Sequence, residues 1–370
     1  MLTIDAIHTE RILLPIRPEW VITGGAGTHN RSPFLIVRVR TEGIEGIGEV
    51  SGTHLWSGEG FETAEAAVRN VLAPLLIGRE LNPNVVRGVM DNALAGFPFT
   101  KAGIDMACWD ALAKSCGVSV GTLLGGSVRN SIRSKFSISG VAPHDAATIA
   151  KQAWEAGFRK FKVKVGTGLS HDLDRVATVR ESLGDEVSLG VDANGGWSLG
   201  EARRALPFLE HMGIAAIEQP LHKANLHETA QLRAHSKIPI LLDESVWNAR
   251  DVAMVARLGA ADAVNIYVGK AGGILGALEA IQVAEALGVG ATLGSNQEMG
   301  IGHAAILQVL SVSNGLDLEM YPPDAAGPMY YTADLVEPAF SIKEGEVSVP
   351  TGPGLGVSIN EEVLRRFRVG

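Results

Sequence analysis

Residues 188–194, Ser-Leu-Gly-Val-Asp-Ala-Asn, carry the pattern that decides the fold: a short apolar run that ends in an acidic residue. The same theme of a β-rich run, a turn and an amphipathic helical stretch repeats from about Ile132 onward. Such alternation is typical of βαβ units around a parallel sheet. We assign eight runs as strands: Phe136–Ser139, Phe161–Val165, Ser188–Asp192, Ala215–Glu218, Pro239–Asp243, Ala263–Tyr267, Gly290–Gly294 and Leu316–Met320.

The spacing of these runs favours a closed barrel. Their ends advance from residue 164 to 192, 218, 243 and 267, a regular step of 24 to 28 residues. A (β/α)₈ barrel requires such regularity, whereas an open doubly wound sheet only tolerates it. We therefore predict an α/β protein built on a TIM-like (β/α) barrel.

A smaller unit is expected ahead of the barrel. Leu35–Arg40 and Ile44–Val50 alternate roughly between apolar and polar residues around Thr41-Glu42-Gly43, which predicts an antiparallel hairpin. The chain of 370 residues has room for a large domain and a smaller one. We predict an α+β capping domain over residues 1–130, the barrel over 131–335, and a segment over 336–370 that returns to complete the cap.

Composition excludes several classes of function. The 32 Lys and Arg residues against 41 Asp and Glu residues give a net charge of −9, which disfavours nucleic acid or an anionic membrane as a partner. The first residues, with Asp5 among them, lack the cationic start and apolar run of a signal peptide, so we expect a cytoplasmic protein. Cys108 and Cys116 fit neither a disulfide framework nor a zinc site, and we expect both to be buried.

The run Phe161-Lys162-Val163-Lys164-Val165 places two lysines two positions apart, so both side chains lie on one face of a strand. An exposed edge strand with solvated lysines would show the same pattern, but a barrel has no edge strand. Two neighbouring ammonium groups lower each other's pKa, which makes one amine available as a base near neutral pH.

Asp192, Glu218 and Asp243 each end one of three successive runs, and the active sites of barrels form at these strand ends. One such carboxylate alone would more often cap a helix or face solvent. Three that converge repel one another unless a cation lies among them. Oxygen ligands without Cys or His favour Mg²⁺, with Mn²⁺ as the second choice. Asn194 and Glu244 are expected to support these ligands, although Glu244 and Asp243 could exchange roles.

Several motifs together resemble the enolase superfamily, and within it the muconate-lactonizing (muconate cycloisomerase) subgroup, across nearly the whole chain. They are Lys162-Val163-Lys164, Asp192-Ala193-Asn194, Glu218-Gln219-Pro220, Asp243-Glu244-Ser245, the helical stretch Ala102–Ala111 and the turn Gly352–Gly356. The resemblance implies a small carboxylic acid substrate whose carboxylate binds the metal, which then stabilises an enediolate. It implies that Lys164 handles the proton at the adjacent carbon, and that Lys162 lies by the substrate carboxylate and keeps the pKa of Lys164 low. It also implies a symmetric homo-oligomer, a dimer or an octamer.

One departure from the subgroup matters for the chemistry. Tyr267 stands where the subgroup usually has a second catalytic lysine, and Lys270 lies three residues later, beyond the strand end. Tyrosine donates a hydrogen bond but is a poor base, so racemisation or epimerisation, which needs a base on each face, is disfavoured. Chemistry that uses Lys164 alone remains: cycloisomerisation first, or elimination by a dehydratase or a succinylbenzoate-synthase-type lyase. A catalytically silent member with a degenerate site is the third interpretation.

Substrate contacts are expected from loops around the barrel mouth. Trp20–Asn30 and Ser51–Gly60 are candidate lid loops. From these loops Trp20, His29, His54 and Trp56 could contact substrate or only pack, and Tyr321 in Met320–Pro323 is a third candidate wall. Glu298 either lies near substrate or stabilises the start of a helix. His303 is expected to be structural.

Overall fold

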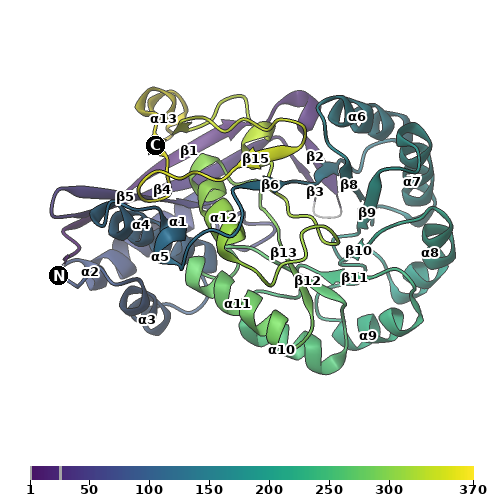
Figure 1. Ribbon diagram of the computed structural model, residues 1–370, viewed down its shortest axis with the longest axis horizontal. Helices are drawn as coiled ribbons and strands as arrows, with labels where there is room; N and C mark the ends of the chain where they lie inside the picture. Colours follow the sequence, from purple (N-terminus) through teal and green to yellow (C-terminus); the bar gives the residue numbers. More distant parts are fainter. Residues whose placement is uncertain (1, 25–26) are drawn as a thin grey trace.

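The computed structural model describes residues 2–24 and 27–370 (Figure 1). The first sheet of the chain is antiparallel. The sheet has the order β1-β4-β5, and the predicted hairpin at Thr41–Ile44 is confirmed as the β4–β5 connection. A small hairpin of β2 and β3 follows a 3₁₀ turn at Pro18–Trp20. The bounds are β1 (Ala6–Pro15), β2 (Ile22–Gly24), β3 (Gly27–His29), β4 (Arg31–Thr41) and β5 (Ile44–Val50).

Helices cover this sheet, and the longest of them, α4 (Pro98–Ser115), packs directly on β5. Fourteen of its residues are buried, which explains why its sequence is not strongly amphipathic. Cys108 lies in this buried set as expected, whereas Cys116 at the helix end is exposed, so that expectation was wrong for Cys116. The other helical segments are α1 (Phe61–Ala67), a π-helical turn (Val68–Leu72), α2 (Ala73–Leu76), α3 (Pro83–Ala93) and α5 (Val120–Leu123).

The contact between β5 and α4 depends on glycine. A Cβ atom on Gly48 would lie 1.9 Å from the carbonyl oxygen of Gly103, which is fixed backbone. We expect Gly48→Ala to lower the free energy of unfolding by about 3 kcal/mol, because the helix would have to move away from the strand. Gly88→Ala is a matched control, since a Cβ there would meet nothing within 4 Å. Chemical denaturation should show it neutral or stabilised by about 1 kcal/mol, and equal losses in both variants would contradict this packing.

The second sheet is parallel and has seven strands in the order β13-β12-β11-β10-β9-β8-β7. Figure 1 shows helices α6 to α11 in an arc around the outer side of these strands. The strands are β7 (Phe136–Ile138), β8 (Lys160–Lys164), β9 (Ser188–Asp192), β10 (Ile217–Glu218), β11 (Ile240–Leu242), β12 (Ala263–Ile266) and β13 (Gly290–Leu293). The helices are α6 (Pro143–Glu155), α7 (Leu169–Leu183), α8 (Leu199–His211), α9 (Leu226–His235), α10 (Ala249–Leu258), α11 (Ile274–Ala286) and α12 (Gly300–Val312).

The eighth predicted strand, Leu316–Met320, is wrong. Residues 318–320 form a turn, in which the amide of Met320 donates to Asp317 Oδ1 at 2.9 Å. Pro322 and Pro323 follow, and proline cannot donate to a sheet ladder. The segment 322–325 instead makes backbone hydrogen bonds toward both edges of the sheet: Asp324 N donates to Leu293 O at 3.0 Å, and Lys135 N donates to Pro323 O at 3.0 Å.

The C-terminal residues run back toward the first sheet. The amide of Val369 donates to Arg11 O at 3.0 Å, and Glu361 in α13 (Glu361–Phe367) forms an ion pair with Arg38 at 2.8 Å. Three short strands and a 3₁₀ turn precede α13: β14 (Val336–Glu337), which pairs with β16 (Ser358–Ile359), β15 (Glu346–Ser348), which pairs with β6 (Ser131–Arg133), and the turn Gly327–Tyr330. Within the described parts of the chain, every helix is too short or too polar to cross a membrane.

Candidate active site

Three buried carboxylates end or follow neighbouring strands. Asp192 ends β9, Glu218 ends β10 and Asp243 directly follows β11, and the three residues are 0%, 2% and 2% exposed. Asp192 and Glu218 are direct register partners across the parallel β9–β10 pair. Because neighbouring parallel strands end at the same edge, their side chains meet at the mouth of the sheet.

Lysine ammonium groups lie among these carboxylates. Lys162 Nζ is 3.0 Å from Glu218 Oε1, 3.3 Å from Asp192 Oδ2 and 3.2 Å from Asp324 Oδ2. Lys164 Nζ donates to Asp192 Oδ2 at 2.7 Å and to Asn194 Oδ1 at 2.9 Å. The two lysines of β8 therefore share one face, as their spacing predicts, and each bridges more than one acceptor.

Burial and the neighbouring charges both shift the pKa values of the site. Burial alone would lower the pKa of Lys162, but the carboxylates of Asp324, Glu218 and Asp192 outweigh burial and raise it well above its ordinary value. Repulsion between the two ammonium groups predicts a lower pKa for one of them, but for Lys162 the nearby carboxylates outweigh this effect. Burial raises the pKa of Glu218 to about 7, although Lys162 opposes the shift.

Tyr267 and Lys270 are both held by Asp243. The Tyr267 hydroxyl donates to Asp243 Oδ2 at 2.6 Å, and its ring stacks on Trp56 with centroids 5.4 Å apart. Burial and the Asp243 charge raise the pKa of Tyr267 well above 10, so its hydroxyl stays protonated. Lys270 is 2% exposed and donates to the carboxylate and carbonyl oxygen of Asp243 and to Asn265 O. All three of its N–H groups are occupied, so it has no free position from which to act as a base.

The oxygen donors of these residues fit a hard divalent cation. In the described part of the chain, however, no three His, Cys, Asp or Glu side chains are arranged closely enough to form a metal centre. The Lys162 ammonium already places a positive charge between Asp192 and Glu218. Two buried oxygen atoms beside these residues, Glu244 Oε2 and Asn265 Oδ1, have no hydrogen-bond partner in the described part of the chain. Oxygen-only chemistry with unsatisfied oxygen atoms suits Mg²⁺ better than a soft metal.

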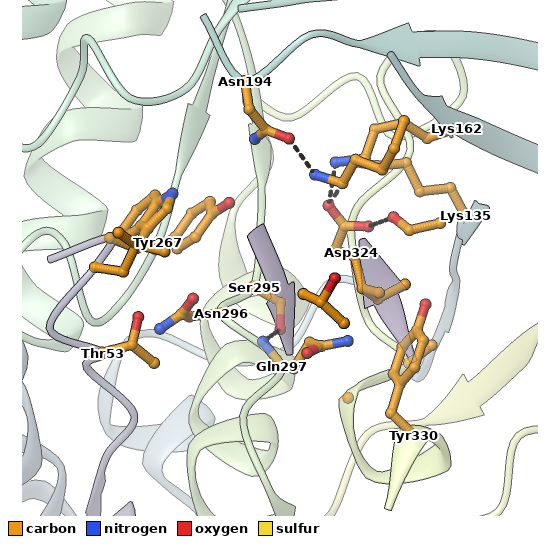
Figure 2. Close-up of a pocket in the computed structure, with 18 residues that line it drawn as sticks. Thr53, Lys135, Lys162, Asn194, Tyr267, Ser295, Asn296, Gln297, Asp324 and Tyr330 are labelled. Atoms are coloured by element: carbon orange, nitrogen blue, oxygen red, sulfur yellow. Dashed lines mark hydrogen bonds and ion pairs between the residues drawn. The ribbon is translucent and has the colours of Figure 1, made fainter. Parts of the chain in front are cut away.

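A cavity of about 200 Å³ lies over this group. Figure 2 shows Lys162 and Lys135, with Asp324 beside them, on the opposite side of the cavity from Tyr267. Neutral polar side chains of Thr53, Ser295, Asn296 and Gln297 line another wall. The cavity is therefore small, cationic on one side and aromatic on the other.

The candidate loop residues are not all brought to this cavity. Trp56 lines it, whereas Trp20 packs edge-on against Phe136 at 5.0 Å and His54 faces Glu62 at 3.8 Å. Tyr321 lines a separate small cavity. The ring of Tyr321 packs so closely on Gly290, at the start of β13, that a Cβ atom on this glycine would lie 2.7 Å from it. His29 is in β3, but its side chain lies outside what the structure describes, as do Gly25 and Ala26 of the first lid loop.

Glu298 is 3% exposed and supports the cavity wall without lining it. It accepts hydrogen bonds from Ser51 Oγ at 3.2 Å, from Ser295 Oγ and from the amide of Asn296. Glu49 from β5 lies nearby and accepts the amides of Met299 at 2.8 Å and Gly302 at 2.9 Å at the start of α12. These two buried acids join the first sheet to the wall of the cavity.

Glu49 makes the stability of this junction depend on pH. Burial raises the pKa of Glu49 from 4.5 to about 8, even though two amides donate to it. The folded chain thus holds this proton more tightly than the unfolded chain, and the resulting stability is complete below pH 4.5 and lost as the pH rises through about 8. We expect Glu49→Gln to flatten the curve of unfolding free energy against pH in this range by a few kcal/mol. Glu42→Gln in the exposed β4–β5 turn should reproduce the parent curve, and an unchanged curve in Glu49→Gln would contradict the assignment.

Sequence reasoning missed Asp324, Lys135 and Ser137. Asp324 Oδ2 lies 3.0 Å from Lys135 Nζ, and the Ser137 hydroxyl donates to Asp324 Oδ1 at 3.4 Å. The misplaced eighth strand hid Asp324, although the pair Pro322-Pro323 directly before it signals that a strand cannot continue there. Backbone strain also marks the site: Asn194 and Gln219 after β9 and β10, and Gln297 after β13, have φ values of 44°, 36° and 58°.

Comparison with known proteins gives the family. Residues 145–363 match the enolase C-terminal domain-like model, and residues 11–125 match the N-terminal domain of mandelate racemase / muconate lactonizing enzyme. The chain is 32% identical to the N-succinyl-L-Arg/Lys racemase of Bacillus cereus, over 99% of this chain and 98% of that protein. It is 32% identical to a chloromuconate cycloisomerase of Cupriavidus necator, over 98% of each.

The three-dimensional structure is also similar to that of a solved relative. Muconate lactonizing enzyme from Pseudomonas fluorescens, crystallised with muconolactone, superposes with a TM-score of 0.95 at 31% identity, and the match covers 100% of both chains. The fold is thus shared over the full length of both chains. The chain therefore belongs to the mandelate racemase/muconate lactonizing enzyme family, and it is an enzyme of the enolase superfamily.

Proposed function

We propose that this enzyme is a metal-dependent cycloisomerase of the muconate type, which stabilises the enolate of a small carboxylic acid and uses Lys164 as its acid/base. One observation carries the proposal: a partly exposed lysine, Lys164, and a tyrosine whose hydroxyl is held by Asp243, Tyr267, line the same cavity. The relatives named as muconate and chloromuconate cycloisomerases support the reaction type.

Asp192, Glu218 and Asp243 would hold the metal, with Mg²⁺ first and Mn²⁺ second. When bound, the metal would supply positive charge that stabilises the substrate carboxylate and the charge that develops on it. Asn194 orients Lys164 through the 2.9 Å hydrogen bond to its ammonium group, and also donates to Glu244 Oε1 at 2.8 Å.

Lys164 then completes the reaction from one face. One substrate carboxylate adds to the alkene, so that a C–O bond forms and the π electron pair moves toward the other carboxylate. The Lys164 ammonium donates a proton to the carbon beside that carboxylate and is later reprotonated by solvent. Lys162 contributes charge near the substrate carboxylate. Tyr267 donates to Asp243, orients that carboxylate and closes the opposite face.

Elimination is the alternative. A dehydratase or a succinylbenzoate-synthase-type lyase would use Lys164 as a base to remove the proton beside the carboxylate, and the same one-sided site favours it. Racemisation or epimerisation would need a base in the place of Tyr267, and so stands lower despite the racemase relative. A catalytically silent member is the least favoured interpretation.

Other expectations from the sequence stay predictions. We propose that the parallel sheet closes into a barrel, with the segment 322–325 in the gap between β13 and β7, because this segment hydrogen-bonds toward both edges. We also propose three domains, with limits 1–130, 131–335 and 336–370. A cytoplasmic location and a homo-oligomeric assembly are proposed as well. Trp56 is proposed to contact substrate, and Glu298 to act through Ser295 and Asn296.

A screen of carboxylic acids with Mg²⁺ in deuterated water tests the proposed reaction. A cycloisomerase should yield a lactone that contains one deuterium from solvent beside the carboxylate. A lyase should instead yield an alkene that has lost the proton beside the carboxylate. Absence of product and of exchange across unsaturated diacids and 3-hydroxy acids would contradict both assignments and favour the silent member.

A further inference from the structure

The two lysines of β8 share a feature that the proposed chemistry does not explain. Each ammonium group bridges a carboxylate of the proposed metal site and a second acceptor outside it. Lys164 links Asp192 to Asn194. Lys162 links Asp192 and Glu218 to Asp324, which is not one of the three proposed ligands.

A divalent cation would compete with the Lys162 ammonium for the same oxygen atoms. Nζ of Lys162 is within 3.3 Å of both Asp192 and Glu218. Two positive centres at so short a distance repel strongly in a buried site. The side chain of Lys162 is only 6% exposed, so its displaced ammonium is stabilised best by another anionic partner.

Asp324 is placed to be that partner. Its Oδ2 atom is 3.2 Å from Lys162 Nζ and 3.0 Å from Lys135 Nζ. Its backbone amide is fixed on Leu293 O at 3.0 Å, and Ser137 Oγ donates to its Oδ1 atom at 3.4 Å. Figure 2 shows the Asp324 carboxylate next to both lysines, at the side wall of the cavity. The carboxylate therefore stays in place whatever occupies the three strand-end ligands.

We propose that Asp324 is the positioning residue of Lys162: it holds the Lys162 ammonium aside when a divalent cation takes Asp192 and Glu218. Lys162 then acts as a built-in counter-ion of Asp192 and Glu218, and Asp324 lowers the cost of exchanging it for the metal. This inference rests on the proposed metal site and extends it to a residue outside the ligand set.

A double-mutant cycle on Mg²⁺ binding tests the inference without any turnover. The probe is MgCl₂ alone, measured by calorimetry and by the rise in melting temperature of the full chain. Asp324→Asn should weaken Mg²⁺ binding about tenfold, because the Lys162 ammonium then stays on the ligands. Lys162→Gln should tighten Mg²⁺ binding about tenfold and lower the melting temperature in the absence of metal. In the Lys162→Gln background, Asp324→Asn should change the affinity less than about threefold.

The controls separate this role from others. Ser137→Ala removes one hydrogen bond to Asp324 and keeps all charges, so it should leave the Mg²⁺ affinity within about twofold. An equal loss from Asp324→Asn in both backgrounds would mean that Asp324 acts directly through its charge, and would overturn the inference. If Asp324→Asn does not fold, Lys162→Gln alone decides, since unchanged or weaker Mg²⁺ binding in it contradicts the competition. If the unaltered chain shows no response to Mg²⁺, the proposed metal site itself fails.

Discussion

Replacing Lys164 by alanine is expected to lower turnover by about 10³- to 10⁴-fold, the range that a positioned acid/base contributes. The loss should be large because no neighbour can take over the proton transfer. Tyr267 stays protonated, Lys270 has all three N–H groups occupied, and Lys162 is held by carboxylates. The measurement is kcat on the substrate that the deuterium screen identifies, together with Mg²⁺ affinity, which should stay within about tenfold of the parent value.

Lys160 provides a matched control on the same strand. It lies at the start of β8, where its ammonium donates to Glu319 O at 2.8 Å, far along the strand from Lys164. Lys160→Met should keep kcat within about threefold of the parent value, because it changes no group that lines the main cavity. Full activity in Lys164→Ala would remove the basis of the proposed mechanism.

Glu218→Gln is expected to weaken Mg²⁺ binding at least about 100-fold and to lower activity by about 10³-fold. Glu218 is on β10, between the strands that bring Asp192 and Asp243 to the same edge. The substitution keeps the size of the side chain and removes one of three negative charges. Calorimetric titration with Mg²⁺ measures the first effect, and turnover at saturating Mg²⁺ the second.

Glu244→Gln is the informative comparison for the metal site. Glu244 Oε1 accepts a hydrogen bond from Asn194 at 2.8 Å, whereas Asp243 holds Tyr267 and Lys270. If Asp243 is the ligand and Glu244 only supports Asn194, Glu244→Gln should cost about tenfold in Mg²⁺ affinity. If Glu244→Gln loses as much Mg²⁺ affinity as Glu218→Gln, Glu244 belongs to the ligand set. A Glu218→Gln variant that binds Mg²⁺ with the parent affinity would contradict the proposed metal site.

Local periodicity explains what the sequence could predict. Seven of the eight predicted runs, from Phe136 to Gly294, are strands, and each is a short apolar segment followed by a turn and a helix. The regular spacing placed Asp192, Glu218 and Asp243 at one edge, since parallel strands in register end together. The alternation of Lys162 and Lys164 likewise follows from the pleat of a strand.

Contacts between distant segments explain what the sequence did not predict. The eighth run failed because Asp317 binds the amide of Met320 locally and the proline pair blocks a ladder. Asp324 enters the site only through hydrogen bonds with Leu293 and ion pairs with Lys135 and Lys162, and no local pattern predicts these. The ring of Tyr267 stacks on Trp56, which belongs to a loop more than 200 residues away in the sequence. This contact helps to bury Tyr267, and burial raises the pKa of its hydroxyl.

The most direct test of one-sided proton chemistry is the position of solvent deuterium in the product. The unaltered chain with Mg²⁺ in deuterated water should place one deuterium on a single face of the carbon beside the carboxylate, as NMR coupling constants show. Chelation of Mg²⁺ and Lys164→Ala should each abolish this label. Deuterium on both faces, or the same label in Lys164→Ala, would contradict a site in which Lys164 acts alone opposite Tyr267.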